Sequence, residues 1–143
     1  MKAKPVLIGA FAAMACMVAG SIYLAATTEK AHKELVTVAS PDGKYKAVRL
    51  TVSGEQPAPF CVDTIAIFLS VYPDSFVASE SNYEIYSAPC AAAGKRKALP
   101  KIEWLSDRAV RITYAPPPAG EKQPRMKDHD ASLFIDVAFV KAE

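Results

Sequence analysis

The two histidines, His32 and His129, are the residues of this chain best suited to proton transfer or metal binding near neutral pH. His129 stands between Asp128 and Asp130, and carboxylate and imidazole groups at such short spacing could bind a metal ion. Lys127 lies beside them and opposes cation binding, so a solvated loop explains the same residues without a ligand. We therefore expect no metal site.

Other catalytic arrangements need groups that this sequence does not gather. Hydrolysis by paired carboxylates would have to use Asp63, Glu84 or Glu103, and no pattern brings two of them together. Ser40 belongs to a turn, and the glycines are isolated, so a phosphate-binding loop is not expected. Because a nucleophile, a base and an orienting group do not occur as a set, we expect no enzyme activity and no cofactor.

Cys61 and Cys90 are the only cysteines beyond residue 16. An oxidising compartment permits a disulfide between them, and two separate buried thiols are the alternative. Neither has another cysteine or a histidine at zinc-ligand spacing. We predict the disulfide, which for a closed loop of this length contributes about 3.6 kcal/mol in the chain-entropy model.

Aromatic and basic side chains suggest two binding surfaces. Aromatic residues gather in an acidic part of the chain, where they could form an exposed recognition face or the buried ends of strands. Three consecutive basic residues follow an alanine-rich segment and suit an acidic partner, anionic lipid or a solvated loop. The candidate partner-binding residues are Tyr72, Phe76, Tyr83, Tyr86, Lys95, Arg96 and Lys97.

An uncharged run begins at Val6 and ends at Ala26. As a helix it would rise about 31 Å, close to the hydrocarbon thickness of a bilayer. Apolar residues continue past Gly20, where a signal peptide could be cleaved, so we predict a retained anchor. The alternatives are a cleaved signal, which would give a secreted periplasmic protein, and a lipoprotein, because Ala13-Met14-Ala15-Cys16 resembles a lipobox.

The basic residues Lys2 and Lys4 precede this run and favour an N-terminus inside the cell. We therefore predict a single-pass protein of the bacterial inner membrane with its C-terminal domain in the periplasm. Ala12, Cys16 and Gly20 recur at four-residue spacing, which could allow a homodimer through close helix packing.

The formal net charge of +2 comes from Lys2 and Lys4, and the rest of the chain is balanced. A neutral domain argues against a nucleic-acid partner, because phosphate binding needs a basic surface. Acidic residues prevail in residues 51–94 and basic residues in residues 95–127. The two segments could neutralise each other in the fold or form a bipolar surface.

The predicted organisation is an anchor (residues 1–27), a polar linker (residues 28–34) and one domain (residues 35–143). Proline and turn residues recur at strand spacing in the domain, and long helical periodicity is absent. The predicted fold is mainly β: an N-terminal transmembrane helix followed by a small antiparallel β-sheet domain of about six to eight strands. A sandwich or a strongly bent sheet would bury both faces of its most apolar strand.

Turn-forming residues and the alternation of apolar with polar residues predict the individual strands. One hairpin joins residues 35–38 to residues 44–52, and a second joins residues 102–105 to residues 109–114, with Trp104 in the core. Residues 62–72 are apolar on both faces and predict a central, doubly covered strand, followed by a short strand at residues 83–86.

The C-terminal part combines a long loop with a last strand. Residues 115–130 are rich in proline and polar residues and predict a long loop. Residues 132–140 predict a strand that can pair with residues 108–114. The side chains expected to point inward are those of Leu133, Ile135, Val137 and Phe139.

The segment Ser40-Pro41-Asp42-Gly43-Lys44-Tyr45 resembles the strand–turn–strand signature of Tol-type and WD-like β-propeller blades, and Trp104-Leu105-Ser106-Asp107 looks like a second, altered copy. A propeller needs about 4–8 blades, so in a chain this short the resemblance implies a hairpin and not a propeller. Together with Cys61 and the strand ending at Tyr114, these motifs are similar to a group of small, uncharacterised bacterial envelope proteins. That resemblance implies secretion and brings no activity with it.

An anchor, a compact β domain and the missing catalytic set together predict a non-catalytic, membrane-anchored periplasmic protein. Its expected role is to bind another envelope protein or to support an assembly. The alternative is an inhibitor or immunity protein against an envelope-acting toxin or hydrolase, because small disulfide-braced β domains with charged loops suit that work.

Overall fold

The computed structural model describes residues 31–92, 94–96 and 98–143. The predicted anchor, its helix-pairing residues Ala12, Cys16 and Gly20, the first part of the linker (residues 28–30), and Lys97 lie outside the described residues. In the described part of the chain, no helix is both long enough and apolar enough to cross a membrane. Ala31–Glu143 form one compact unit.

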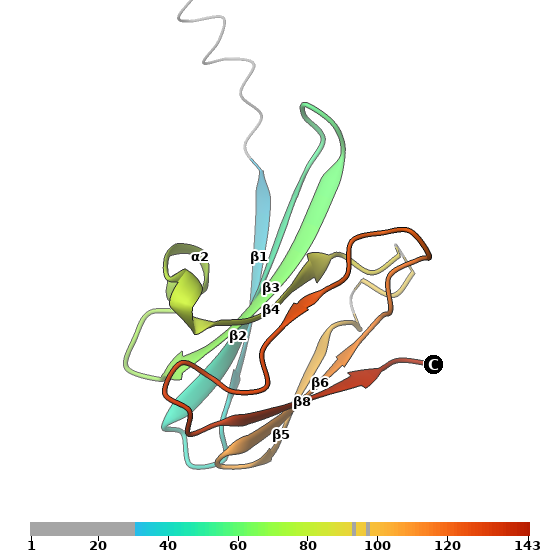
Figure 1. Ribbon diagram of the computed structural model, residues 1–143. Helices are drawn as coiled ribbons and strands as arrows, with labels where there is room; N and C mark the ends of the chain where they lie inside the picture. The colour runs from blue at the N-terminus through green and yellow to red at the C-terminus, as the bar shows by residue number, and fades with distance from the viewer. Residues whose placement is uncertain (1–30, 93, 97) are drawn as a thin grey trace, which may run out of the picture. The chain divides into compact units, whose positions relative to one another are not determined.

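The described residues form two β-sheets and almost no helix (Figure 1). The larger sheet has the strand order β1-β2-β3-β4-β7, and the smaller sheet has the order β5-β6-β8. The predicted mainly β domain is confirmed, and its strand pairs are antiparallel except for that of β6 with β8. The strands are β1 His32–Ala39, β2 Tyr45–Gly54, β3 Phe60–Leu69, β4 Glu84–Pro89, β5 Lys101–Ser106, β6 Ala109–Tyr114, β7 Arg125–Met126 and β8 Asp136–Lys141. The helical turns are α2 Phe76–Ser79 and the 3-10 turn η1 Ser81–Tyr83.

The first predicted hairpin is present as β1 and β2. Hydrogen bonds among the residues of the turn stabilise the connection between the two strands. The backbone N–H of Gly43 donates to the carbonyl of Ser40 over 2.9 Å, and the Ser40 hydroxyl accepts the N–H of Tyr45 over 3.1 Å. Gly43 has φ 71°, a left-handed conformation that glycine adopts without steric cost. The predicted C-terminal boundary of the linker, at residue 34, is wrong, because His32 already pairs with Ser53 and so belongs to β1.

The predicted central strand is β3, which lies between β2 and β4. Ile65 and Ile67 are fully buried on one face, and Phe68 is buried on the other, as expected of a doubly covered strand. The strand ends at Leu69, earlier than predicted, and Val71 is 84% exposed. The apolar run therefore extends beyond the part that the sheet covers.

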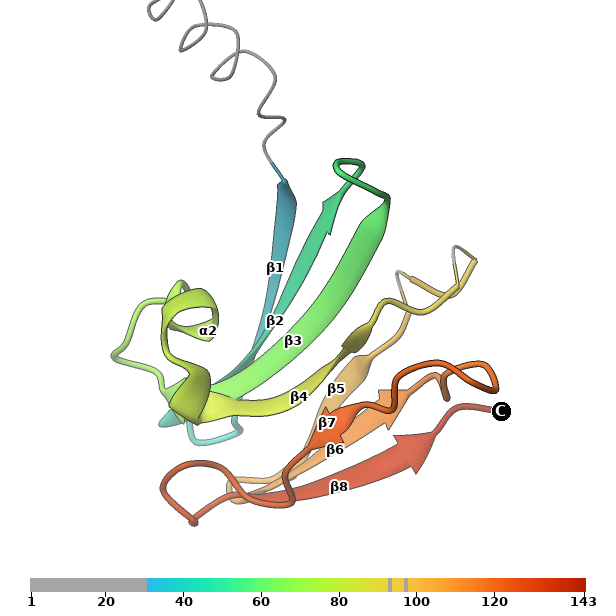
Figure 2. The same ribbon diagram turned by 45° about the horizontal axis from the view of Figure 1, so that its top comes forward.

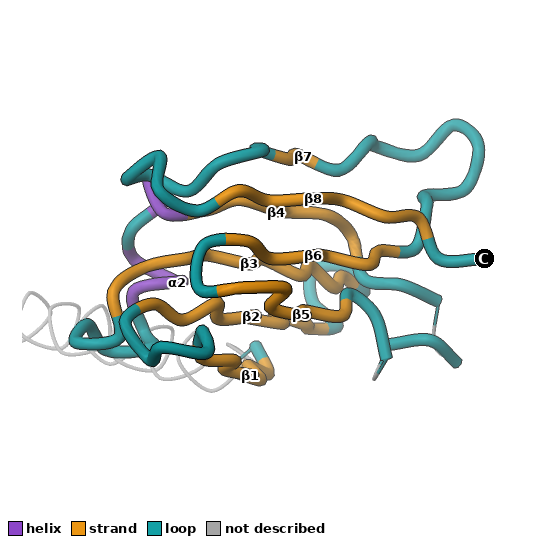
Figure 3. The backbone as a smooth tube through the Cα atoms, turned by 90° about the horizontal axis from the view of Figure 1, so that it is seen from below, coloured by secondary structure: helices purple, strands orange, loops and turns teal. Residues whose placement is uncertain are grey.

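The two sheets pack face to face around the main hydrophobic core (Figures 2 and 3). From the smaller sheet, Val110, Ile112 and Tyr114 alternate inward along β6, as the sequence predicted. Trp104 packs against this core, and its indole Nε1–H donates to the carbonyl of Val38 over 3.0 Å. That bond ties the smaller sheet to β1.

The last strand differs from the prediction in its start and its direction. β8 pairs with β6 as expected, but the pairing is parallel, from Ala109↔Asp136 to Tyr114↔Lys141. Residues 115–135 carry the chain back to the start of β6, which makes the parallel direction possible. β7 lies inside the predicted loop of residues 115–130 and pairs with β4.

Leu133 was expected to point inward but is 75% exposed, and its φ is 62°. The reason is the carboxylate of Asp130, which accepts the backbone N–H groups of Phe134 and Ile135 over 3.1 and 3.0 Å and holds this segment as a turn. Further along, Ile135 and Val137 are buried as predicted, and Phe139 is half-buried against the core.

Candidate functional site

Three aromatic side chains stack on the outer face of the larger sheet, beside α2. The rings of Tyr72 and Phe76 are stacked, with centroids 4.9 Å apart and planes 15° apart. Tyr83 lies 6.2 Å from Phe76, and both contact the buried ring of Phe68 at 5.9 Å. We call Val71, Tyr72, Phe76 and Tyr83 the aromatic surface.

Asp74 fixes the loop that carries this surface. Its carboxylate accepts a hydrogen bond from the Thr37 hydroxyl of β1 over 2.7 Å and pairs with the ammonium group of Lys46 in β2. The hydrogen bond from Lys46 lowers the pKa of Asp74 below its usual range, so the carboxylate stays charged at neutral pH. Lys46 also lies 5.5 Å from the centroid of the Phe68 ring, where a cation is attracted to the π face.

The aromatic surface combines side chains that a partner could contact with side chains that are held in place by packing. Tyr72 is 36% exposed, whereas Phe76 and Tyr83 are half-buried. Val77 in α2 is buried beneath them and anchors the helical turn. Large, rigid aromatic groups that lose little freedom on contact are the side chains that contribute most to protein interfaces.

Tyr86 does not belong to this surface, contrary to the expectation that grouped it with the other three. Its strand pairs it with Ile65, so its ring points into the core between the sheets and is 3% exposed. There it lies 6.1 Å from Tyr114 and 6.2 Å from Phe139. Burial raises the pKa of its phenol to about 12, so it remains neutral.

The basic residues lie elsewhere, in the loop between β4 and β5. Lys95 and Arg96 are exposed, with Lys95 Nζ 3.3 Å from the main-chain oxygen of Glu143. This loop begins at Cys90, beside the start of β3, whereas the aromatic surface follows the end of β3. The two predicted sets of binding residues are therefore at opposite ends of that strand.

The predicted disulfide is confirmed. Cys61 and Cys90 are bonded, with their Cα atoms 5.3 Å apart. The backbone N–H of Cys90 also donates to the carbonyl of Cys61 over 3.0 Å. The bridge thus joins β3 to the end of β4 at the edge of the loop that carries the basic residues.

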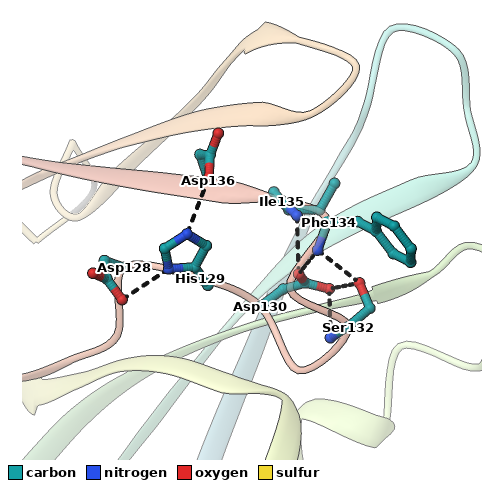
Figure 4. Close-up of polar contacts among 7 residues, drawn as sticks. All are labelled: Asp128, His129, Asp130, Ser132, Phe134, Ile135 and Asp136. Carbon is teal, nitrogen blue, oxygen red and sulfur yellow. Dashed lines mark hydrogen bonds and ion pairs between the residues drawn. The ribbon is translucent and has the colours of Figure 1, made fainter.

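His129 lies between two carboxylates, one of which the sequence did not suggest (Figure 4). Its Nδ1 is 3.0 Å from Asp128, and its Nε2 is 3.2 Å from Asp136 in β8. The hydrogen bond with Asp128 raises the pKa of His129 and lowers that of Asp128. Only the fold, which brings the start of β8 beside this loop, could reveal Asp136 as a partner.

The remaining groups near His129 have structural partners of their own. The carboxylate of Asp130 accepts the backbone N–H and the hydroxyl of Ser132, so that hydroxyl is bonded to Asp130 (Figure 4). Within the described residues, no group of three histidine, cysteine or acidic side chains could hold a metal ion. The other histidine, His32, is an exposed residue of β1.

The carboxylates considered for hydrolysis also lie apart. Glu84 pairs with Arg125 over 3.0 Å, and Glu103 lies 3.9 Å from Arg111 on the smaller sheet. Asp63 is 3% exposed and accepts the hydroxyl of Thr51, and burial raises its pKa. Each of the three has a local role in the sheet to which it belongs.

A second buried charge, on Arg49, was not expected from the sequence. Arg49 is 8% exposed, and its Nη1 donates to the carbonyl of Pro100 over 2.9 Å. Its charge attracts Asp63 and partly offsets the effect of burial on that carboxyl group. An arginine within an alternating strand gives no sequence signal that it points into the space between two sheets.

One hollow lies at the end of the domain that carries the disulfide. It has a volume of about 460 Å³, and alanine and proline side chains line it, among them Pro89, Pro116 and Pro124. Lys95 and Glu121 are the ionisable side chains at its wall besides Glu143. This lining offers apolar contacts to a bound group. It does not place an acid and a base where they could act on the same substrate.

Comparison of the chain with protein-family models, with curated proteins and with solved structures finds no match.

Proposed function

We propose that this chain is a membrane-anchored, non-catalytic envelope protein whose periplasmic β domain binds another protein through the aromatic surface. The observation that carries the proposal is the stack of Tyr72, Phe76 and Tyr83, which Asp74 holds against the sheet. A preorganised surface of this kind pays little entropy on binding, and tyrosine adds a hydrogen-bonding hydroxyl to a large apolar area.

The compartment is proposed from two features. The uncharged run of residues 6–26 has the length of a transmembrane helix and follows Lys2 and Lys4. The disulfide between Cys61 and Cys90 suits an oxidising compartment such as the periplasm. Both features fit a domain held outside the inner membrane.

The test is crosslinking of the full chain in intact cells, followed by purification from membranes and mass spectrometry. The wild-type chain should capture a specific partner, and the double variant Tyr72→Ala/Tyr83→Ala should lose it. Phe134→Ala is the matched control, because Phe134 is an exposed aromatic residue outside the aromatic surface. A partner that the double variant retains, or no specific partner, would contradict the proposal. Capture of a toxin or a hydrolase would favour an inhibitor or immunity role for the same surface.

A further inference from the structure

The outer face of the larger sheet carries an exposed apolar patch at the end where β1 begins. Leu35, Phe60 and Val62 are 47%, 41% and 38% exposed, and the half-buried Val52 lies among them. The strand register places these side chains on one face, because Val52 pairs with Val62 and Leu35 pairs with Leu50, two residues before Val52. We call Leu35, Val52, Phe60 and Val62 the apolar patch.

Phe60 is held in a defined position within this patch. It pairs with Gly54, and a Cβ atom added to Gly54 would lie 2.6 Å from Cε1 of the Phe60 ring. The ring therefore lies directly against the backbone of β2, in space that only glycine leaves free. Such a fixed aromatic side chain can present its exposed edge without a large loss of entropy on contact.

The helical turn α2 covers the other end of the same face but not the apolar patch. Val77 of α2 packs with Val48, Ala66 and Phe68, near the end of β3 that leads to the aromatic surface. Towards the other end of β3, the described part of the chain contributes no helix or loop that buries Phe60. A partly exposed apolar sheet face of this kind indicates a contact with something outside the domain.

The length of chain between the apolar run and β1 indicates what that contact is. Ala26 ends the run, and His32, paired with Ser53, begins β1 only six residues later. Six residues span at most about 20 Å when fully extended. With residues 6–26 in a bilayer, the end of the sheet that carries Phe60 therefore has to stay close to the membrane surface.

The charges near this end suit a surface that contains anionic lipid. Lys33 lies on the same face as the apolar patch, because it pairs with Val52. Lys95 and Arg96 lie in the loop that begins at Cys90, which is bonded to Cys61, the neighbour of Phe60. Basic side chains close to anionic headgroups add to the attraction that apolar contact provides.

We propose that the apolar patch lies against the surface of the bilayer, with Phe60 among the lipid headgroups, as a second attachment beside the anchor. This inference rests on the proposed anchoring of residues 6–26. β3 separates Phe60 from Leu69 by about 30 Å, so the aromatic surface lies at the far end of the same face from this contact. The domain would then be held in one orientation instead of turning freely on its tether.

Site-specific photo-crosslinking of the full chain tests this contact. The chain is reconstituted into vesicles of phosphatidylethanolamine and phosphatidylglycerol, with the photoreactive analogue benzoylphenylalanine replacing Phe60 or, in a second protein, Leu35. The control replaces Phe134, which is 60% exposed and lies beside Arg108 in the loop before β8. Figure 1 draws that loop at the end of the domain opposite the start of β3. Flotation of the vesicles reports anchoring separately, and the Cys61–Cys90 disulfide reports folding.

We expect both patch positions to form lipid adducts several-fold more often than position 134. Protein that floats with the vesicles but forms no excess of lipid adducts at positions 60 and 35 would overturn the inference and leave the anchoring intact. Adducts to a second protein chain in place of lipid would also overturn it. Protein that does not float would overturn the anchoring and, with it, the contact.

Discussion

His129 makes the loop before β8 sensitive to pH at the scale of a single residue. The fold raises its pKa above the ordinary value of 6.5, mainly through the hydrogen bond with Asp128, and Asp136 adds to the effect. Its contribution to stability is therefore complete below pH 6.5 and is lost as the pH rises through the raised pKa. The fold lowers the pKa of Asp128, so the contribution of this carboxylate to stability is present at neutral pH and is lost as the pH falls below 3.8.

We predict that His129 titrates above its ordinary value of 6.5, as measured by NMR of its imidazole side chain. The variant Asp128→Asn should move the midpoint of His129 down, because it removes the partner that stabilises the charged ring. Ser132→Ala, which leaves both carboxylates beside His129 in place, is the control. A midpoint of His129 at or below 6.5 would show that the ion pairs do not form in solution.

Asp130 has a larger structural effect, because it is 4% exposed and its carboxylate accepts four hydrogen bonds. We predict that Asp130→Ala lowers the free energy of unfolding by about 2–4 kcal/mol, since buried N–H groups such as that of Ile135 would lose their acceptor. Urea unfolding measures the change. The neighbouring Asp128→Ala, in an exposed position, should cost clearly less. Similar costs for the two variants would contradict the role assigned to Asp130.

At the scale of the elements, β3 contributes to both hydrophobic clusters and should be the strand least tolerant of change. We predict that Ile67→Ala lowers the free energy of unfolding by about 3 kcal/mol, because Ile67 is fully buried between the sheets. Val71→Ala, four residues along the chain and 84% exposed, should change it by less than about 0.5 kcal/mol. Chemical unfolding of the two variants gives the comparison, and a small loss for Ile67→Ala would mean that the core is loosely packed.

The elements that local chemistry determines could be predicted from the sequence. The hairpin of β1 and β2 follows from a turn whose serine, aspartate and glycine satisfy one another, and β3 follows from an apolar run that needs cover on both faces. The start of β1 could not be predicted, because His32, Lys33 and Glu34 are exposed edge residues without an apolar pattern.

The direction of β8 and the position of Tyr86 depend on contacts between distant residues. β8 runs parallel to β6 because Asp130 turns the chain just before it, and the sequence gives Asp130 no mark that separates it from a solvated aspartate. In the candidate site, Tyr72, Phe76 and Tyr83 come together as neighbours along the chain. Tyr86 lies on the opposite, inner face, because it pairs with the inward-facing Ile65 of β3.

At the scale of the whole molecule, the disulfide joins β3 to the end of β4 within the compact unit of Ala31–Glu143. We predict that reduction of Cys61–Cys90 lowers the free energy of unfolding by about 3.6 kcal/mol, through the greater freedom of the unfolded chain. Urea unfolding with and without a reductant measures this change. The double variant Cys61→Ala/Cys90→Ala should have the free energy of unfolding of the reduced wild type, and the reductant should not change it. Unchanged stability of the wild type in reductant would contradict the prediction.

The uneven charge of the sequence is partly balanced within the fold. Arg125, from the basic segment, pairs with Glu84 of the acidic segment where β7 meets β4. Lys95 and Arg96 remain exposed at the end of the domain that carries the disulfide. The folded domain is thus balanced in total charge, and these two exposed bases stand at the end that the proposed membrane contact uses.

The pairing of β8 with β6 also sets the order in which the domain can be completed. Ile135 and Val137 belong to the same core as Ala47 and Ile65, although they follow them by some seventy residues or more in the chain. Until this C-terminal segment has been delivered, the inner face of the larger sheet has no full apolar cover. A chain that is synthesised or exported from its N-terminus therefore finishes folding only after its last strand has emerged, and during that interval its incomplete core is open to a chaperone or a protease.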